Sequence, residues 1–149
     1  MYSSGVSSYQ VNVRNAFEAI LLKYKVDVYL SGHIHWYERL FPMGTNGTID
    51  SSSIVNKNTY YTGAGKSLSH ITNGMAGNIE SHSTLSSNEP ILSITAVLDQ
   101  VNYGFSKLHF HDATKATWHF IKGGGSGLGA ELTLIREELE VSYECIQHK

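Results

Sequence analysis

Residues 30–39 read LSGHIHWYER, and in this stretch two histidines, His33 and His35, stand one residue apart directly after an apolar run. The run, residues 26–30, is short and largely apolar, which is typical of a buried strand. Before it, apolar side chains at helical spacing predict an amphipathic helix over roughly residues 10–25. A strand that follows a helix in this way is typical of an α/β sheet, in which ligands bind at the carboxyl ends of the strands. We therefore expect the two histidines at such an edge.

The expected helix has a start signal and an apolar face. Ser7 and Gln10 have the spacing of a capping box, which satisfies the free N–H groups of a first helical turn. Five apolar side chains recur at helical spacing and are expected to pack on the core: Val13, Phe17, Ile20, Leu21 and Tyr24.

The two histidines are candidate metal ligands. Gly32 in front of them is expected to let the backbone turn sharply and approach a bound ion closely. Two imidazoles form only part of a metal shell, because zinc usually takes three or four protein ligands and a two-metal site takes more. From the spacing alone, a metal site and a pair of hydrogen-bonded histidines in a polar loop both remain open.

The rest of the chain predicts strands and loops. Residues 43–53 are rich in Gly, Thr, Asn and Ser and predict a loop, in which Asn46 begins a glycosylation acceptor, Asn-Gly-Thr, if the protein follows the secretory route. Residues 73–82 predict a long surface or active-site loop, residues 91–101 fit a strand or a short helix, and residues 137–149 read as a poorly ordered tail. Strands are expected at residues 58–62, 103–111, 115–122 and 131–136, the middle two forming a hairpin.

A second pair of histidines, His109 and His111, is also spaced two residues apart. On a strand they would share one face and be able to bind a metal. Because no glycine turn precedes them and a hairpin tip lies beside them, we expect a solvated pair instead.

The composition limits the class of protein. At 149 residues with 41% hydrophobic content, the chain has enough apolar material for one core and one domain. The formal net charge is -2 and the 11 Lys and Arg are scattered, which argues against nucleic acid or an anionic membrane as a partner. No apolar run approaches the roughly 20 residues of a membrane span. Cys145 is the single cysteine, which excludes an internal disulfide and leaves the compartment open, and the first residues carry no secretion signal.

The stretch Gly32-His33-Ile34-His35, extended through Arg39, resembles the last metal-ligand motif of the calcineurin-like metallophosphoesterases, and specifically of the purple acid phosphatases. Other stretches resemble the C-terminal part of a fungal member: residues 2–4, 26–30, 60–63, 73–80, 103–108 and 132–135. The resemblance implies that residues 1–136 are the C-terminal part of a catalytic domain. Its fold class would be α/β (α+β), a portion of a four-layer αββα sandwich. The parent protein would be a secreted acid phosphatase.

The same resemblance implies a dinuclear centre of iron(III) with zinc, iron or manganese, which hydrolyses phosphate monoesters. In the family pattern His33 would hold the divalent ion and His35 the iron. Four further residues are candidates to orient a ligand or to approach the substrate: Glu38, Arg39, Asn78 and His82. For Glu38 and Arg39 the alternative is a surface ion pair.

The chain departs from the family pattern, because the other metal ligands come from four motifs that precede the histidine pair and none of them is present. Residues 77–80 imitate one, a Gly-Asn-His motif, but have isoleucine in place of histidine and follow His35. We therefore expect the chain alone to be inactive, to need the N-terminal part of the catalytic domain, and to expose sheet edges without it. Two other functions stay open: a non-catalytic β-rich binding or structural module, and phytase or nucleotide-diphosphatase activity on the same scaffold.

Overall fold

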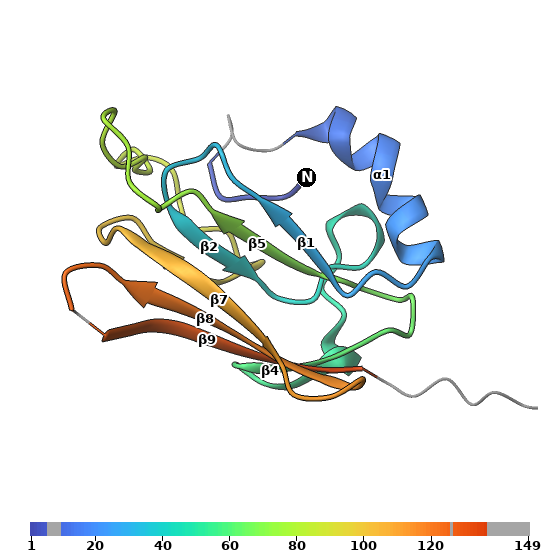
Figure 1. Ribbon diagram of the computed structural model, residues 1–149. Helices are drawn as coiled ribbons and strands as arrows, with labels where there is room; N and C mark the ends of the chain where they lie inside the picture. The colour runs from blue at the N-terminus through green and yellow to red at the C-terminus, as the bar shows by residue number, and fades with distance from the viewer. Residues whose placement is uncertain (6–9, 126, 137–149) are drawn as a thin grey trace, which may run out of the picture.

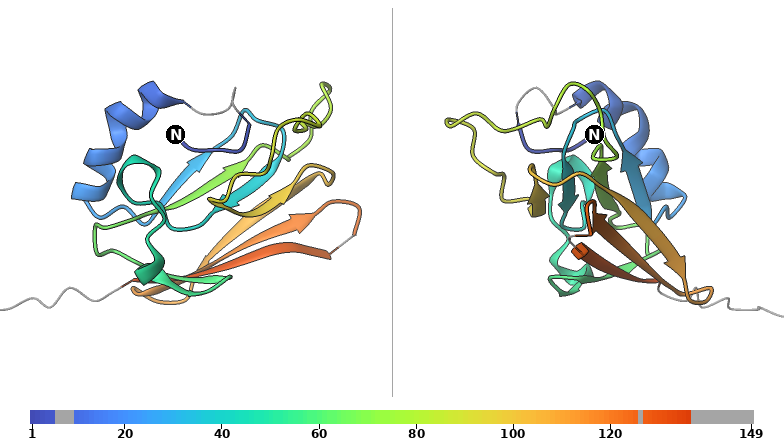
Figure 2. Two further views of the ribbon diagram at one scale, coloured as in Figure 1. Left: turned by 180° about the vertical axis from the view of Figure 1, so that it is seen from behind. Right: turned by 60° about the vertical axis from the view of Figure 1, so that its left-hand side comes forward.

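The computed structural model describes residues 1–5, 10–125 and 127–136, which form two β-sheets that face each other and a helix beside the first sheet (Figure 1). The views in Figure 2 show the helix α1 (Val11–Lys23) on the side of the first sheet that points away from the second. This layering confirms the mixed α/β fold class. Among the described residues no α-helix covers the outer face of the second sheet, and none is long and apolar enough to cross a membrane.

The first sheet has four strands in the spatial order β1-β5-β2-β6. Strand β1 runs parallel to β5, whereas β2 is antiparallel to both β5 and β6. Because β5 lies between β1 and β2, the loop that follows β5 lies beside the loop that joins β1 to β2. The strand bounds are Val28–Ser31 for β1, Tyr37–Leu40 for β2, Ser69–Asn73 for β5 and Thr95–Asp99 for β6.

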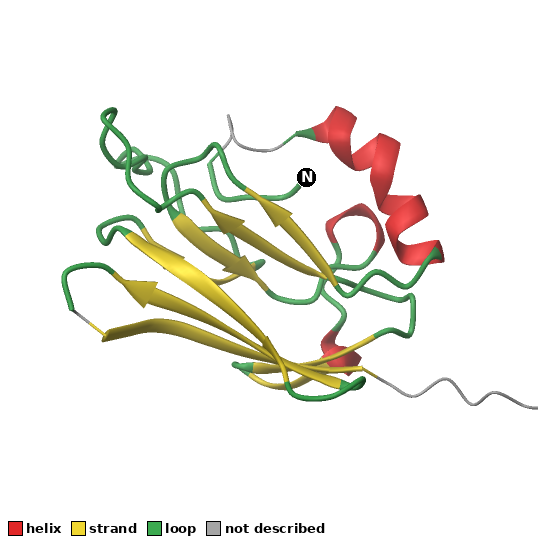
Figure 3. Cartoon of the chain, viewed as in Figure 1, coloured by secondary structure: helices red, strands yellow, loops and turns green. Residues whose placement is uncertain are grey.

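The second sheet has five strands in the order β3-β4-β9-β8-β7, and all neighbours are antiparallel except β4 and β9. In Figure 3 this part of the chain consists mostly of strands, drawn in yellow, and of loops, drawn in green. Two single-turn 3₁₀ helices, Thr45–Gly47 and Ser51–Ser53, lie in the loop before it. The strand bounds are Ile54–Asn56 for β3, Thr59–Thr62 for β4, Gly104–Phe110 for β7, Lys115–Lys122 for β8 and Gly127–Arg136 for β9.

The main core lies between the two sheets. Tyr37 of β2 stacks on Phe120 of β8 with ring centroids 4.4 Å apart and an interplanar angle of 6°. Side chains from both sheets complete this cluster: Trp36, Tyr60, Ile71, Met75, Trp118, Leu132 and Leu134. A second, smaller cluster of Met1, Tyr2, Leu40 and Met43 fills the space on the helix side of the first sheet.

Several expected elements are confirmed. The predicted helix is α1, the strand at 58–62 is β4, and the hairpin is β7 and β8. Residues 91–101 contain the strand β6, and the last strand begins at Gly127, four residues earlier than expected. Gln10 is the N-cap residue but makes no capping side-chain hydrogen bond, while Ser7 and the tail at 137–149 lie outside the described residues.

The predicted packing face of the helix is wrong in part. Phe17, Ile20 and Tyr24 are 51%, 52% and 70% exposed, whereas Glu18 and Leu22 are buried. Glu18 is buried because its carboxylate accepts hydrogen bonds from the Tyr2 hydroxyl and from the Asn46 N–H. The helix therefore packs through one side and leaves an apolar side uncovered within the described residues.

Candidate metal centre

His33 and His35 lie in the turn between β1 and β2, directly after the carboxyl end of β1, as the sequence predicts. Two short backbone hydrogen bonds fold this turn tightly: Ile34 N–H donates to Gly32 O at 2.9 Å, and Trp36 N–H donates to Ile34 O at 2.9 Å. The prediction that the backbone turns at Gly32 is wrong. The residue with a left-handed backbone conformation is His33, with φ 74°. For a residue with a side chain this conformation costs roughly 1–2 kcal/mol, and such strain is concentrated at functional sites.

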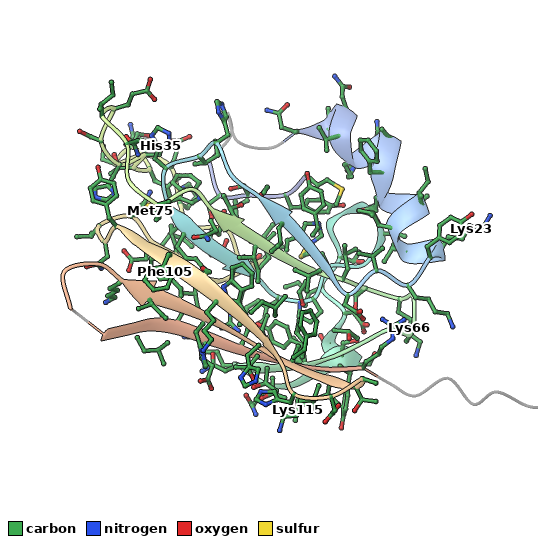
Figure 4. All side chains as sticks on the ribbon, viewed as in Figure 1. Lys23, His35, Lys66, Met75, Phe105 and Lys115 are labelled. Carbon is green, nitrogen blue, oxygen red and sulfur yellow. The ribbon has the colours of Figure 1, made fainter. Side chains whose placement is uncertain are left out.

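His35 is held from the loop that follows β5 (Figure 4). Its ring Nδ1 lies 3.1 Å from the Ser81 carbonyl oxygen, and its backbone N–H donates to Ser83 Oγ at 3.0 Å. The backbone N–H of Ser83 in turn donates to His35 O at 3.0 Å. A carbonyl only accepts, so Nδ1 carries the proton and the lone pair of the neutral ring lies on Nε2. This is how a metal-binding histidine is usually oriented.

His33 is placed differently. Its side chain is exposed and borders a cavity of about 400 Å³ on the helix side of the first sheet. The N-terminal segment and the neighbouring strands line the rest of this cavity: Met1, Tyr2, Ser3, Tyr29 and Thr72. The ring of His35 thus lies against the loop after β5, whereas the ring of His33 borders the cavity, although only Ile34 separates the two residues in the chain.

Gly74, the first residue after β5, sets the position of this turn. A Cβ atom at Gly74 would lie 1.8 Å from Ile34 O and 2.7 Å from the Ile34 carbonyl carbon. Only a glycine permits this approach of the two backbones. In addition, Gly74 N–H donates to Trp36 O at 3.1 Å.

These residues fit one part of a metal shell. One acidic group lies beside His35: the Glu80 carboxylate, whose Oε2 is 3.8 Å from His35 Nε2. Across the part of the chain that the structure describes, no three His, Cys, Asp or Glu side chains are grouped to hold a metal ion. Zinc and two-metal sites need more ligands than this turn offers, so it can contribute donors to a centre but cannot complete one.

Glu38 contacts neither histidine. It is 1% exposed, and its carboxylate accepts hydrogen bonds from the Ser3 hydroxyl, the Ser4 N–H at 2.9 Å and the Thr95 hydroxyl at 2.8 Å. The carboxylate therefore ties the N-terminal segment and β6 to β2. The alternative of a surface ion pair is wrong for this residue.

Arg39 is also buried, with no exposed surface. Its Nη2 donates to Asn58 Oδ1 at 2.8 Å and to Lys57 O at 3.2 Å, and the guanidinium lies 5.4 Å from the centre of the Tyr60 ring. It faces the second sheet, on the opposite side of β2 from Glu38, so a surface ion pair is wrong here too. Neither residue orients an imidazole in this structure.

Asn78 and His82 lie in the loop that holds His35. The Asn78 side-chain oxygen accepts a hydrogen bond from the Glu80 N–H at 2.8 Å. The His82 ring stacks on Tyr103 with centroids 4.0 Å apart. These contacts shape the loop over residues 78–83, and a role of either residue toward substrate stays a prediction.

The sequence reasoning missed the residues that support His35. Glu80 ends the stretch 77–80, which departs from the family motif, and no local pattern marks Gly74, Ser81 or Ser83. The signal that finds them is the pairing of β1 with β5, because the carboxyl ends of two parallel strands meet at the same edge of a sheet.

Comparisons with known proteins agree with this geometry. The family model described as "Iron/zinc purple acid phosphatase-like protein C" matches residues 67–129. An acid phosphatase of Aspergillus ficuum is 61% identical over 136 residues, which are 91% of this chain and 22% of that protein. A probable inactive purple acid phosphatase 27 of Arabidopsis thaliana is 34% identical over 90% of this chain and 20% of its own length.

A solved structure shows the same similarity to purple acid phosphatases. The purple acid phosphatase isolated from yellow lupin (Lupinus luteus) seeds matches with a TM-score of 0.64 and 25% identity, over 80% of this chain and 19% of that one. The chain thus spans about a fifth of the length of the proteins that it matches. The chain is similar in sequence and in fold to the C-terminal part of purple acid phosphatases.

Proposed function

We propose that this chain contributes His33 and His35 to the dinuclear metal centre of an acid phosphatase that hydrolyses phosphate monoesters. The observation that carries the proposal is the oriented imidazole of His35 in a chain 61% identical to a fungal acid phosphatase. His33 would give one nitrogen to the divalent ion, which is zinc, iron or manganese, and His35 would give Nε2 to iron(III). When bound, such a metal pair polarises a phosphate ester and lowers the pKa of a bound water.

The remaining ligands would come from the part of a full-length relative that this chain does not cover, about four-fifths of its length. An uncovered surface on this chain supports the proposal that such a part packs against it. The edge of β1 that faces away from β5 has no strand partner among the described residues, and a groove of about 400 Å³ lies between β1 and the end of the β7–β8 hairpin. Apolar side chains line the groove, among them Val28, Leu30, Leu108, Phe110 and Leu134.

Exposure along this surface is unusually high for apolar side chains. Leu30 is 51% and Phe110 71% exposed, and the outer side of α1 adds Phe17 and Ile20. A large apolar patch of this kind is typical of an interface. We infer that the rest of the catalytic domain adds a neighbour to β1 and covers α1, which would make the chain inactive on its own.

The non-catalytic alternative has one supporting observation. The two Arabidopsis relatives, 34% and 30% identical, both carry "probable inactive" in their names. The higher identity of 61% is to a protein named an acid phosphatase, which favours the catalytic proposal. Secretion and glycosylation belong to the same proposal, and Asn46 is exposed on a tight turn, where a glycan has room.

A chimera tests the proposal. This chain would replace the matching segment of the Aspergillus ficuum acid phosphatase, and hydrolysis of p-nitrophenyl phosphate and the iron and zinc content per chain would be measured. We expect an active, metal-loaded chimera, and we expect His33→Ala or His35→Ala to lower the rate by at least about 100-fold and to reduce the metal content. His119→Ala, on the outer face of the second sheet, is the matched control and should leave both unchanged.

Other outcomes separate the alternatives. Full activity and metal content in the His33→Ala and His35→Ala chimeras would refute the ligand roles. Metal-dependent turnover by the isolated 149-residue chain would refute its dependence on the rest of the domain. A folded chimera that binds metal and prefers phytate or a nucleotide diphosphate would move the substrate away from simple monoesters.

A further inference from the structure

We propose that His109 and His111 form a separate surface site for a divalent transition metal, such as copper(II) or nickel(II), on the outer face of the second sheet. The site is independent of the phosphatase proposal and uses none of its residues. The sequence alone favoured a solvated pair at these positions, and the positions of the two rings in the structure are the new observation.

The sheet register places both rings on one face. In the β7–β8 hairpin His109 lies opposite Thr117, and His111 N–H donates to Lys115 O at 2.9 Å, which continues the ladder one residue beyond β7. Residues two apart on a strand point to the same side. The neighbouring side chains of β8, Trp118 and Phe120, belong to the core between the sheets, so the histidines face outward.

The rings are close enough to share one ion. Their centroids are 4.4 Å apart, with an interplanar angle of 34°. Two imidazoles that bind one ion at right angles, with metal–nitrogen bonds of about 2.0–2.1 Å, have ring centroids about 4.5 Å apart. Nitrogen donors at right angles suit the square-planar or tetragonal geometry of copper(II) and nickel(II), with water in the remaining positions.

Neighbouring groups support a metal-binding state of His111. Its Nε2 lies 2.8 Å from the Thr117 hydroxyl, which can accept from Nε2–H and so leave Nδ1 free for the ion. Thr117 is itself buried, beneath this face. Asp112, the next residue in the chain, carries a carboxylate that accepts hydrogen bonds from the Thr114 N–H at 2.7 Å and from the Thr114 hydroxyl at 2.8 Å. A fixed negative charge there favours a cation.

A third histidine on the same face provides the control. His119 lies opposite Lys107 on β7 and pairs with Glu131, with Nε2 and Oε2 2.9 Å apart. Because no group of three possible ligands occurs within the described ranges, His119 is not expected to reach the ion. Its substitution removes an outward-facing imidazole of the same sheet without removing the pair.

The test is a titration of the untagged 149-residue chain with nickel(II), followed by calorimetry, in a His33→Ala/His35→Ala background that removes the other histidine pair. We expect one ion per chain, and binding at least about tenfold weaker in His109→Asn or His111→Asn, since one donor cannot chelate. His119→Asn should bind as the background does. Far-UV circular dichroism checks that each variant keeps its strands, and asparagine retains polarity at these exposed positions.

Two results would overturn the proposal. One is unchanged binding in both His109→Asn and His111→Asn, or an equal loss in His119→Asn. The other is the same affinity for the chain unfolded in urea, because the site depends on the register that brings the rings together. Copper(II) in place of nickel(II) repeats the test with a second reporter, quenching of Trp118 fluorescence.

Discussion

Substitution of Gly74 by alanine tests whether the loop after β5 positions the histidine turn. A Cβ atom at this position would lie 1.8 Å from Ile34 O, while ordinary contacts begin at 3.4 Å, so the two backbones must separate by about 1.6 Å. Overpacking of this kind costs about 1–3 kcal/mol, and we expect the upper end because both partners are backbone. The separation also breaks the hydrogen bond from Gly74 N–H to Trp36 O.

The matched control lies in the same turn. A Cβ atom at Gly32 would meet nothing within 4 Å, and Gly32 is not left-handed, so Gly32→Ala should be nearly neutral. We expect Gly74→Ala to lower the melting temperature by about 8–10 °C, using about 3 °C per kcal/mol for a chain of this length. Gly32→Ala should change it by less than about 2 °C.

The assay is thermal and urea unfolding followed by the fluorescence of Trp36 and Trp118, which are 3% and 6% exposed. Hydrogen exchange at the amides of Trp36 and residue 74 gives a local readout that does not require a cooperative transition. Equal stability of Gly74→Ala and Gly32→Ala, with both amides protected as in the parent chain, would refute this account of the turn.

Two further predictions concern individual histidines. His33→Gly should be more stable than His33→Ala by about 1 kcal/mol in urea unfolding, because glycine adopts φ 74° without a Cβ penalty and neither variant keeps the exposed ring; equal stability would contradict the strain. Burial, followed by the nearby N-terminal amino group, lowers the pKa of His70 to about 3. Since the unfolded chain binds this proton below about pH 6.5, stability should be full above that pH and be lost progressively down to about pH 3, with about 2 kcal/mol lost at pH 5. Urea unfolding at pH 7.5 and at pH 5 should show a smaller fall in the free energy of unfolding for His70→Phe than for the parent chain. An equal fall in both proteins would contradict the prediction.

The sequence was sufficient for the elements whose patterns are local. The helix, β1, β4 and the β7–β8 hairpin follow from side-chain periodicity and turn chemistry. The two central strands of the first sheet were missed, because β2 contains Glu38 and Arg39 and β5 contains His70. These side chains are buried, and partners distant in sequence, such as Thr95 for Glu38, make the burial of the two charged ones possible. No local pattern reveals such partners.

The histidine pair was found, but its surroundings were not. Its place after β1 follows from the strand alone, whereas the support of His35 comes from Ser81 and Ser83, more than 40 residues later. The helix shows the opposite case. Its apolar pattern is real, but Phe17 and Ile20 have no cover within the described residues, so the pattern predicted a packing surface and not its partner.

The two histidines differ in how they are held, and the difference explains the importance of Gly74. His35 is fixed by hydrogen bonds to its ring and its backbone, so its orientation does not depend on His33. His33 keeps a strained φ of 74° with an exposed ring, so the strain must be balanced by the backbone of the turn. That backbone is fixed by the bond from Trp36 N–H to Ile34 O and by the contact of Ile34 with Gly74. The conformation of one proposed ligand is therefore maintained by a glycine on the neighbouring strand's loop, which no inspection of the His-x-His motif itself would reveal.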